Sequence, residues 1–372
     1  MKRHQSIEIQ PLCNPVPRPK NIDPISNQRI MAPTIPNSQR KQRRIALCLG
    51  DPAGIGAEVS LKALAALEGQ GIEVLLVGCR RWLERTHDAL RDVTATALAD
   101  PADHSMIDLP LAGALEPGRG NAVSGAASFA WLTAAAELVR NGDCHALTTA
   151  PIAKQAWHAA GHPYPGQTER LAELCGGVEP SMLFTARPPH GQWRLNTLLA
   201  TTHIPLSEVP QRLTPALVER KLSVLLAFCR RFEPRPRLVV AGLNPHAGET
   251  GLLGREEQDW LIPTLERWRH RHPEVDLLGP LPPDTCWLGA AAAWRGDANG
   301  PSGYLALYHD QGLIPVKLLA FDEAVNTSLG LPFLRTSPDH GTGFDIAGQG
   351  IARSRSMEAA LETAWELSWT DS

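Results

Sequence analysis

The chain has 372 residues, of which 43% are hydrophobic and 20% charged, and its formal net charge is −3. This length suits two domains with separate cores, and the small net charge gives no reason to expect a nucleic acid or a membrane as partner. The chain has no continuous apolar run of about eighteen residues, so we expect no transmembrane helix. Its seven cysteines are scattered without a CxxC pair, which favours reduced thiols and a cytoplasmic location.

Residues 1–44 differ in composition from the rest of the chain. They contain nine Lys or Arg, two acidic residues and seven prolines, without apolar periodicity. Such a segment cannot bury enough surface to order itself, so we predict a disordered, basic tail. It has no apolar core of the kind found in secretory signals. Because this tail carries +7, the remainder of the chain carries −10.

From residue 44 onward, apolar segments typical of strands and helices alternate. The patterns predict strands at residues 44–50, 72–78, 144–151, 195–206, 236–245 and 303–312. They predict helices at residues 57–67, 128–142, 213–232, 255–271 and 354–369. Strands joined by helical crossovers indicate an α/β fold with a largely parallel sheet. Ligands of such sheets bind where strands end at their carboxyl edges.

Three histidines follow predicted apolar strands. They are His203 in ATTHIPL, His246 in GLNPHAGETG and His309 in LYHDQGLIP. Neutral imidazole is a common ligand of zinc and similar divalent ions, and open catalytic sites often take three protein ligands. Any one of them is more often an ordinary strand-end histidine, but three in equivalent places favour a metal site.

Polar residues near these histidines suggest further roles. Asp310 follows His309 and can orient a metal ligand or act as a base. Lys317 can bind an anion or move a proton, although a solvated lysine is the alternative. The Gly- and Pro-rich segment 326–345 reads as a loop, in which Arg335 suits a carboxylate or phosphate. Asp339 in the same segment reads as a turn residue.

Two further segments join a strand or loop to a helix. In GDPAGIGAE, residues 50–58, the glycines allow close backbone approach, but Glu58 opposes an anion and the three-glycine dinucleotide fingerprint is absent. YPGQTER, residues 164–170, offers Gln167 and Thr168 as hydrogen-bond donors, with a helix cap by Thr168 as the alternative.

Taken together, these segments resemble the 4-hydroxythreonine-4-phosphate dehydrogenase family. GDPAGIG, GLNPHAGE, GPLPPDT, YHDQG and LGLPFLRTSPDHGT occur in the family's order and approximate spacing. The resemblance implies a two-domain fold similar to isocitrate and isopropylmalate dehydrogenases, which bind NAD without the usual fingerprint. One domain would comprise residues 45–145 and 326–372 on the NAD side. The other, residues 146–325, would carry the metal, the substrate and the dimer interface.

The resemblance also implies roles for individual residues. His203, His246 and His309 match the family's ligands for one divalent metal cation (Zn, Mg or Co), and the active site is shared by a homodimer. Gln167, Thr168, Lys317, Asn326 and Arg335 match substrate-binding positions, and Asp310 and Lys317 are the catalytic candidates. The implied reaction oxidises a small phosphorylated hydroxy amino acid with NAD or NADP, and the resulting β-keto acid loses carbon dioxide.

One position departs from the family pattern. Its usual GHTE reads GQTE here, so Gln167 stands where a substrate-contacting histidine is expected. Glutamine can donate a hydrogen bond but cannot carry charge. A paralogue that oxidises another hydroxy acid or a dihydrodiol carboxylate is therefore the alternative within the enzyme class. A metal-dependent hydrolase is the alternative from another class, and a non-catalytic binding protein would have no use for the whole residue set.

Overall fold

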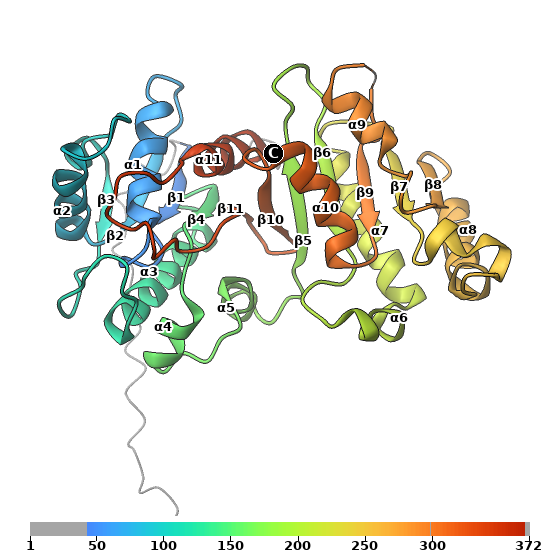
Figure 1. The fold of residues 1–372 in the computed structure, drawn as a ribbon, viewed down its shortest axis with the longest axis horizontal. Coiled ribbons are helices and arrows are strands. Elements are labelled where there is room, and N and C mark those ends of the chain that lie inside the picture. The colour runs from blue at the N-terminus through green and yellow to red at the C-terminus, as the bar shows by residue number, and fades with distance from the viewer. Residues whose placement is uncertain (1–42, 298, 369–372) are drawn as a thin grey trace, which may run out of the picture. The chain divides into compact units, whose positions relative to one another are not determined.

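A computed structural model describes residues 43–297 and 299–368 of the chain. The expected disordered tail at residues 1–44 falls almost entirely outside the described residues. Eleven strands in this part of the chain form one continuous sheet in the order β3-β2-β1-β4-β11-β10-β5-β6-β9-β7-β8. Figure 1 shows helices packed along the strands, with β11, β10 and β5 near the middle of the sheet.

The sheet consists of two parallel groups joined by antiparallel strands. The first group contains β3 (Met106–Asp108), β2 (Val74–Gly78), β1 (Ile45–Cys48), β4 (Ala146–Thr149) and β11 (Leu334–Pro338). The joining strands are β10 (Val325–Leu329) and β5 (Ser181–Ala186). The second group contains β6 (Leu195–Leu199), β9 (Gly303–Ala306), β7 (Arg237–Ala241) and β8 (Asp276–Leu281). The prediction of an α/β fold with a largely parallel sheet is confirmed.

Eleven α-helices are present in the described residues. They are α1 (Gly56–Ala66), α2 (Arg80–Arg91), α3 (Ala122–Arg140), α4 (Lys154–Ala159), α5 (Gln167–Leu174), α6 (Val209–Arg212), α7 (Pro215–Cys229), α8 (Ile262–Arg271), α9 (Leu288–Trp294), α10 (His309–Ala320) and α11 (Arg355–Leu367). Short 3-10 turns occur at Pro101–Asp103 (η2), Leu206–Glu208 (η3) and Pro245–Gly251 (η4), and a π-helical turn, η5, spans Glu257–Leu261.

Local sequence explains several of the helix starts. The side chain of Asn121 accepts from the Val123 and Ser124 amides at the start of α3, and Ser124 returns a bond to the Asn121 amide. At the start of α7, the side chain of Thr214 accepts from the Leu217 amide, and Pro215 occupies the first helical position. These side chains satisfy amides that have no partner within the helix, so each start is fixed locally.

Buried apolar runs form the centre of the sheet. Strands β1 and β4 are buried along their whole length, as expected where helices cover both faces of a parallel sheet. Helix α3 alone among the described helices is long and apolar enough to cross a membrane. Because 56% of its most apolar window is buried inside the fold, it also fits a core helix, and its composition is weak evidence for a membrane span.

Several elements differ from the sequence-based expectation. Residues 325–338, read as part of a loop, form the antiparallel pair β10 and β11, with Gly330 at positive φ in the turn. The abundance of Gly and Pro hid two strands of only five residues each. The strand expected at residues 303–312 ends at Ala306, and α10 begins at His309. The division into two domains stays a prediction.

Candidate functional site

A cavity of about 790 Å³ lies on one face of the sheet near its middle. Five of the nine predicted site residues line it: Gln167, Thr168, His203, Asn326 and Arg335. Arg335 and Ser337 are two residues apart on β11, so their side chains lie on the same face of the sheet. Asn326 of β10 is paired with Ser337 and lies on that face too. His246, His309, Asp310 and Lys317 are not part of this wall. The assignment of all nine residues to one site stays a prediction.

Arg335 is a buried cation that forms no ion pair within the described residues, although the carboxylate of Glu169, which lines the same cavity, acts on it electrostatically. Its side chain is 4% exposed and donates to Thr149 Oγ1 at 2.7 and 3.1 Å and to Ser328 Oγ at 3.3 Å. No carboxylate lies within ion-pair distance of it in the described chain, and burial lowers the pKa of Arg335 to about 10. A desolvated guanidinium held only by hydroxyl groups favours an anionic ligand.

The start of α5 forms another part of the wall. Gln167 Nε2 donates to the carbonyl oxygen of Ala150 at 3.0 Å, while Gln167 Oε1 is buried without a hydrogen-bond partner. Thr168 lines the cavity, and no side-chain cap is present at this helix start, so the cap expected as its alternative role is absent. The free amides of a helix start also favour an anion.

His203 and His309 come together beside the cavity. They follow the neighbouring parallel strands β6 and β9, and their ring centroids are 5.3 Å apart. Asp310 Oδ1 lies 2.7 Å from His309 Nδ1, an arrangement that orients the imidazole and leaves Nε2 free for a ligand. Burial, and then the neighbouring His309 and Lys154, lower the pKa of His203. The neutral imidazole that this favours is the metal-binding form.

His246 lies in an unusual turn after β7. Residues 246–250 all have positive φ, and every non-glycine residue of that kind in the described chain belongs to this turn. Left-handed backbone costs about 1–2 kcal/mol for each non-glycine residue. Such strain persists where surrounding contacts enforce it and is concentrated at functional sites. The turn therefore adds local support for a functional role of His246.

The three histidines do not form a complete metal site within one chain. The described residues contain no group of three or more His, Cys, Asp or Glu side chains that could hold a metal ion. His203 and His309 nevertheless have the properties of a ligand pair, because their rings are close together, a carboxylate orients His309, and burial lowers the pKa of His203. These residues fit part of a divalent metal site that needs further ligands.

Lys317 and Asp339 form an ion pair at the edge of the cavity. Lys317 Nζ, on α10, contacts the carboxylate of Asp339, which follows β11 and lines the cavity. The assignment of Asp339 as a simple turn residue overlooked this contact. Alternation along the strand could have revealed it, because residues 335, 337 and 339 point the same way. Thr149 and Lys154 also line the cavity, and no sequence signal indicated either of them.

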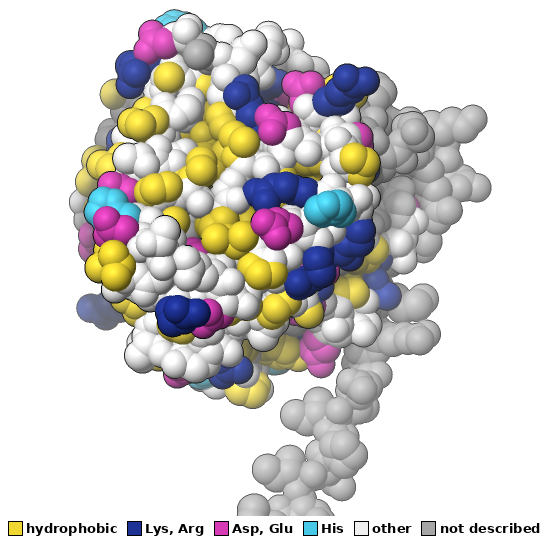
Figure 2. All heavy atoms as spheres, turned by 90° about the vertical axis from the view of Figure 1, so that its right-hand side faces the viewer, with side chains coloured by type: hydrophobic (Ala, Val, Ile, Leu, Met, Phe, Trp, Pro, Cys, Tyr) yellow, Lys and Arg dark blue, Asp and Glu magenta, His cyan; other side chains and the backbone are white. Residues whose placement is uncertain are grey.

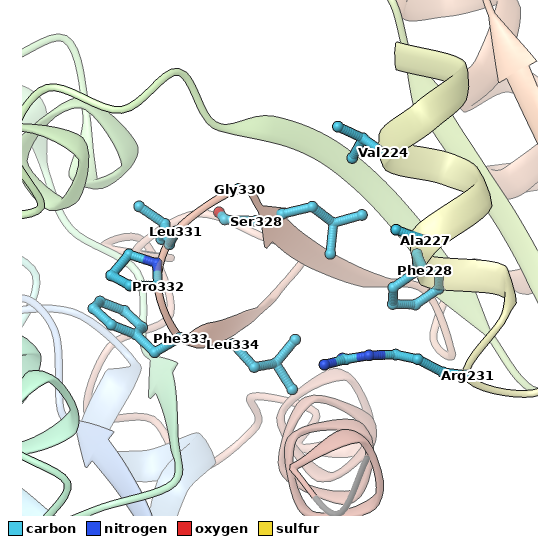
Figure 3. Close-up of a pocket in the computed structure, with 11 residues that line it drawn as sticks. Val224, Ala227, Phe228, Arg231, Ser328, Gly330, Leu331, Pro332, Phe333 and Leu334 are labelled. Carbon is cyan, nitrogen blue, oxygen red and sulfur yellow. The ribbon is translucent and has the colours of Figure 1, made fainter. Parts of the chain in front are cut away.

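A second cavity, of about 440 Å³, lies between α7 and the turn that joins β10 to β11. Figure 3 shows Val224, Ala227 and Phe228 of α7 on one side and Leu331, Pro332 and Phe333 of the turn on the other. Its wall is apolar except for Ser328 and Arg231. It contains none of the predicted site residues, so we do not assign the reaction to it.

The edge of the sheet at β8 has a mixed surface. Figure 2 shows this side of the protein, where charged side chains of both signs lie among hydrophobic ones. Arg269 Nε donates to the carbonyl oxygen of Leu277 at 3.0 Å, and Arg269 Nη2 donates to that of Gly279. These bonds occupy carbonyls of the edge strand, which limits its pairing with another sheet.

Comparison with known proteins agrees with the geometry. The model of the family described as pyridoxal phosphate biosynthetic protein PdxA matches residues 70–364. The chain belongs to this family. The 4-hydroxythreonine-4-phosphate dehydrogenase of Synechococcus sp. (strain RCC307) is 63% identical over 327 residues, covering 87% of this chain and 99% of the relative. The D-threonate 4-phosphate dehydrogenase of Salmonella typhimurium is 40% identical and covers 87% of this chain and 99% of its own.

A solved structure of the PdxA type has the same fold. The crystal structure of 4-hydroxythreonine-4-phosphate dehydrogenase from Klebsiella pneumoniae superposes with a TM-score of 0.74 at 38% identity. It covers 88% of this chain and 98% of its own. The family resemblance of the sequence motifs is confirmed. The relatives are dehydrogenases, which gives no support to the hydrolase alternative.

Proposed function

We propose that this protein oxidises 4-phosphooxy-L-threonine with NAD or NADP during pyridoxal 5'-phosphate biosynthesis. The product would be a 3-oxo acid that decarboxylates to 3-amino-2-oxopropyl phosphate. The observation that carries the proposal is Arg335, a buried guanidinium that forms no ion pair within the described residues and lies in the wall of a polar cavity. A substrate with a phosphate and a carboxylate would supply the missing anion. The names of the relatives provide independent support.

The chain's own residues would bind and orient this substrate. Arg335 would hold one anionic group, while Thr168 and Asn326 would donate hydrogen bonds to the polar groups between the two ends. Lys317, paired with Asp339 at the cavity edge, would hold the proton exchanged with the C3 hydroxyl. After the C1–C2 bond breaks and carbon dioxide leaves, the electron pair passes to the C3 oxygen. C2 then takes a proton.

The nicotinamide and one divalent cation (Zn, Mg or Co) would supply, when bound, a hydride acceptor and an electrophile that polarises the C3 oxygen. His203 and His309 would contribute ligands to the cation, and Asp310 would orient His309 through its 2.7 Å contact. His246 would be the third ligand. We place the nicotinamide on the side of residues 45–145 and 326–372.

We further propose a homodimer with a shared active site. Ile314 and Leu318 of helix α10 are 59% and 80% exposed, and Phe321, directly after the helix, is 60% exposed; their spacing places them on one face. Exposed apolar surface of this kind marks an interface. Because α10 begins at His309, a partner on this face would bring its own residues near the histidine pair.

The free, mostly buried cysteines of the described chain support a reducing compartment such as the cytoplasm.

Gln167 favours a second candidate substrate. The family histidine is replaced here, and a relative of 40% identity is named for D-threonate 4-phosphate. That compound carries a hydroxyl instead of an amino group at C2. The higher identity to relatives named for 4-hydroxythreonine 4-phosphate supports the first candidate.

The test is a substrate panel with purified protein, NAD or NADP and Zn²⁺, Mg²⁺ or Co²⁺, followed by the absorbance of the reduced nicotinamide. We expect turnover of 4-phosphooxy-L-threonine with a kcat/KM at least tenfold above that for D-threonate 4-phosphate and for a dihydrodiol carboxylate. A higher kcat/KM for D-threonate 4-phosphate or for a dihydrodiol carboxylate would show that the protein is a paralogue with a different substrate. Product formation without reduced nicotinamide would contradict a dehydrogenase.

A further inference from the structure

The buried carboxylate of Glu257 lies beneath the left-handed turn that carries His246. Glu257 is 0% exposed and begins η5. Its Oε1 accepts from the backbone amides of Leu243 at 2.7 Å and Asn244 at 2.8 Å, and its Oε2 accepts from Asn244 Nδ2 at 2.9 Å. The two amides belong to the residues just before the turn. The carboxylate of Glu257 therefore fixes the backbone at Leu243 and Asn244, directly before the turn.

The turn also packs directly against this carboxylate. A Cβ atom added to Gly248 would lie 2.8 Å from Glu257 Oε2 and 2.9 Å from the carbonyl oxygen of Gly254. Only glycine fits there, and Gly248 has a φ of +82°. The backbone thus closes around Glu257 with no space between them. No cation forms an ion pair with this carboxylate in the part of the chain that the structure describes.

A second side chain links this turn to the histidine pair. Gln311 of α10 donates through Nε2 to the carbonyl oxygen of Gly242 at 2.7 Å and accepts from the Leu307 amide at 2.7 Å. Gly242 follows β7 and Leu307 follows β9, so Gln311 ties together the ends of the two strands that precede His246 and His309. The backbone below His246 is consequently fixed at both sides, by Gln311 and by Glu257.

We propose that Glu257 is a positioning residue, which holds the left-handed turn so that His246 is presented as a metal ligand. This inference rests on the proposed function, because it takes His246 to be a ligand. Glu257 acts through the backbone and does not contact substrate or cation. Partners that orient metal ligands typically change metal affinity by about tenfold to a hundredfold when they are replaced.

The test is the affinity for Co²⁺ or Zn²⁺ measured by calorimetric titration of the full-length protein. We expect Glu257→Gln to weaken binding at least tenfold, while the thermal unfolding transition stays cooperative. Glu256→Gln is the matched control, because Glu256 accepts from the same Asn244 side chain at 2.7 Å but not from the backbone amides. It should bind as the wild type does. In the metal-free Glu257→Gln variant, the Leu243 and Asn244 amides should exchange hydrogen faster.

A double-mutant cycle separates this role from general destabilisation. If Glu257 acts only through His246, Glu257→Gln should have no further effect on metal affinity in the His246→Ala background. An additive effect, or unchanged affinity in Glu257→Gln, would overturn the inference. If Glu257→Gln does not unfold cooperatively, the affinity of Asn244→Ala is measured instead and compared with that of Glu256→Gln, because Asn244→Ala removes the side-chain bonds to both Glu257 Oε2 and Glu256 Oε2 but keeps the two backbone bonds to Glu257 Oε1. A loss of about threefold supports the role, and no loss contradicts it. A wild-type protein that binds no divalent cation would instead contradict the proposed function.

Discussion

At the scale of single residues, the unusual property of Arg335 is that its charge is buried and its side chain is hydrogen-bonded only to hydroxyl groups among the described residues. Thr149 and Ser328 orient the guanidinium, but neither neutralises it. A substrate anion that binds Arg335 would therefore also stabilise the folded structure around this residue. This couples substrate binding to the stability of the region around β11.

The first prediction concerns this residue. Arg335→Ala should lower kcat/KM for 4-phosphooxy-L-threonine at least about tenfold, near 1.4 kcal/mol, because a charge-assisted contact is lost. Added guanidinium should restore part of the activity by occupying the vacated space. Arg119→Ala is a control at an exposed arginine that pairs only with Glu116. An unchanged kcat/KM in Arg335→Ala would exclude the assigned role.

Gln167 gives a second prediction at this scale. Its amide nitrogen is held by the Ala150 carbonyl, and a histidine N–H could donate the same bond. If hydrogen bonding is all that the position supplies, Gln167→His should change kcat/KM for 4-phosphooxy-L-threonine by less than about tenfold. The pH–rate profiles of both forms should be recorded. A gain above about a hundredfold, some 2.7 kcal/mol, would mean that the native protein is tuned for a different substrate.

At the scale of elements, helix α10 carries two features that we propose to be functional. Its first residue, His309, faces His203, and its later residues expose an apolar stripe. A helix is rigid over this length, so a contact made by the stripe also determines where His309 lies. In the proposed dimer, partner binding would therefore influence the position of His309.

The prediction at this scale is that Leu318→Glu dissociates the proposed dimer. A charge placed at an apolar position that is 80% exposed should not harm the isolated fold but should oppose burial in an interface. Analytical ultracentrifugation should give a monomer, and turnover should fall at least about tenfold. Val93→Glu, at an exposed position on a different surface, should leave the wild-type assembly unchanged. A Leu318→Glu protein that sediments as the wild type does would show that the stripe is not the interface.

The sequence alone was sufficient to predict many elements but not all. Buried runs such as Ile45–Cys48 and the long helix Pro215–Cys229 were predicted because their apolar patterns are strong. Strands β10 and β11 were missed, because each is short and the turn between them is rich in Gly and Pro. Residues 246–250 carry a left-handed conformation that ordinary side chains disfavour, so no propensity could have indicated it.

At the scale of the whole molecule, a buried ion pair within α1 is hydrogen-bonded to a segment almost 300 residues further along the chain. Lys62 Nζ contacts Glu58 Oε1 at 2.7 Å and donates to the carbonyl oxygens of Gly350 and Ala352, both at 2.8 Å. Glu58 in turn accepts from the Ala352 amide. The acidic residue that was read from the sequence as opposing an anion is thus neutralised internally. It connects α1 to the segment before α11.

Breaking this pair should cost substantial stability. Lys62→Met leaves Glu58 buried without its cation, so we expect the free energy of unfolding to fall by about 3–5 kcal/mol. The double variant Glu58→Gln with Lys62→Met should recover part of this loss, because Gln keeps the acceptor for Ala352. Thermal and denaturant unfolding of the three proteins would measure the effect. Equal stabilities of wild type and Lys62→Met would contradict the importance of the pair.

The two ends of the described chain are also in direct contact. Arg43 Nε and Nη2 donate to Ser368 Oγ at 3.0 and 2.8 Å, and its guanidinium lies 3.9 Å from the ring centroid of Trp365. A short linker could therefore join residues 43 and 368, and new ends could be opened in an exposed turn such as Gly69–Gly71. This circular permutant should fold and keep its activity, since termini that lie close together usually tolerate such a rearrangement. A folded permutant would show that the fold depends on the order of strands in the sheet and not on the position of the chain ends.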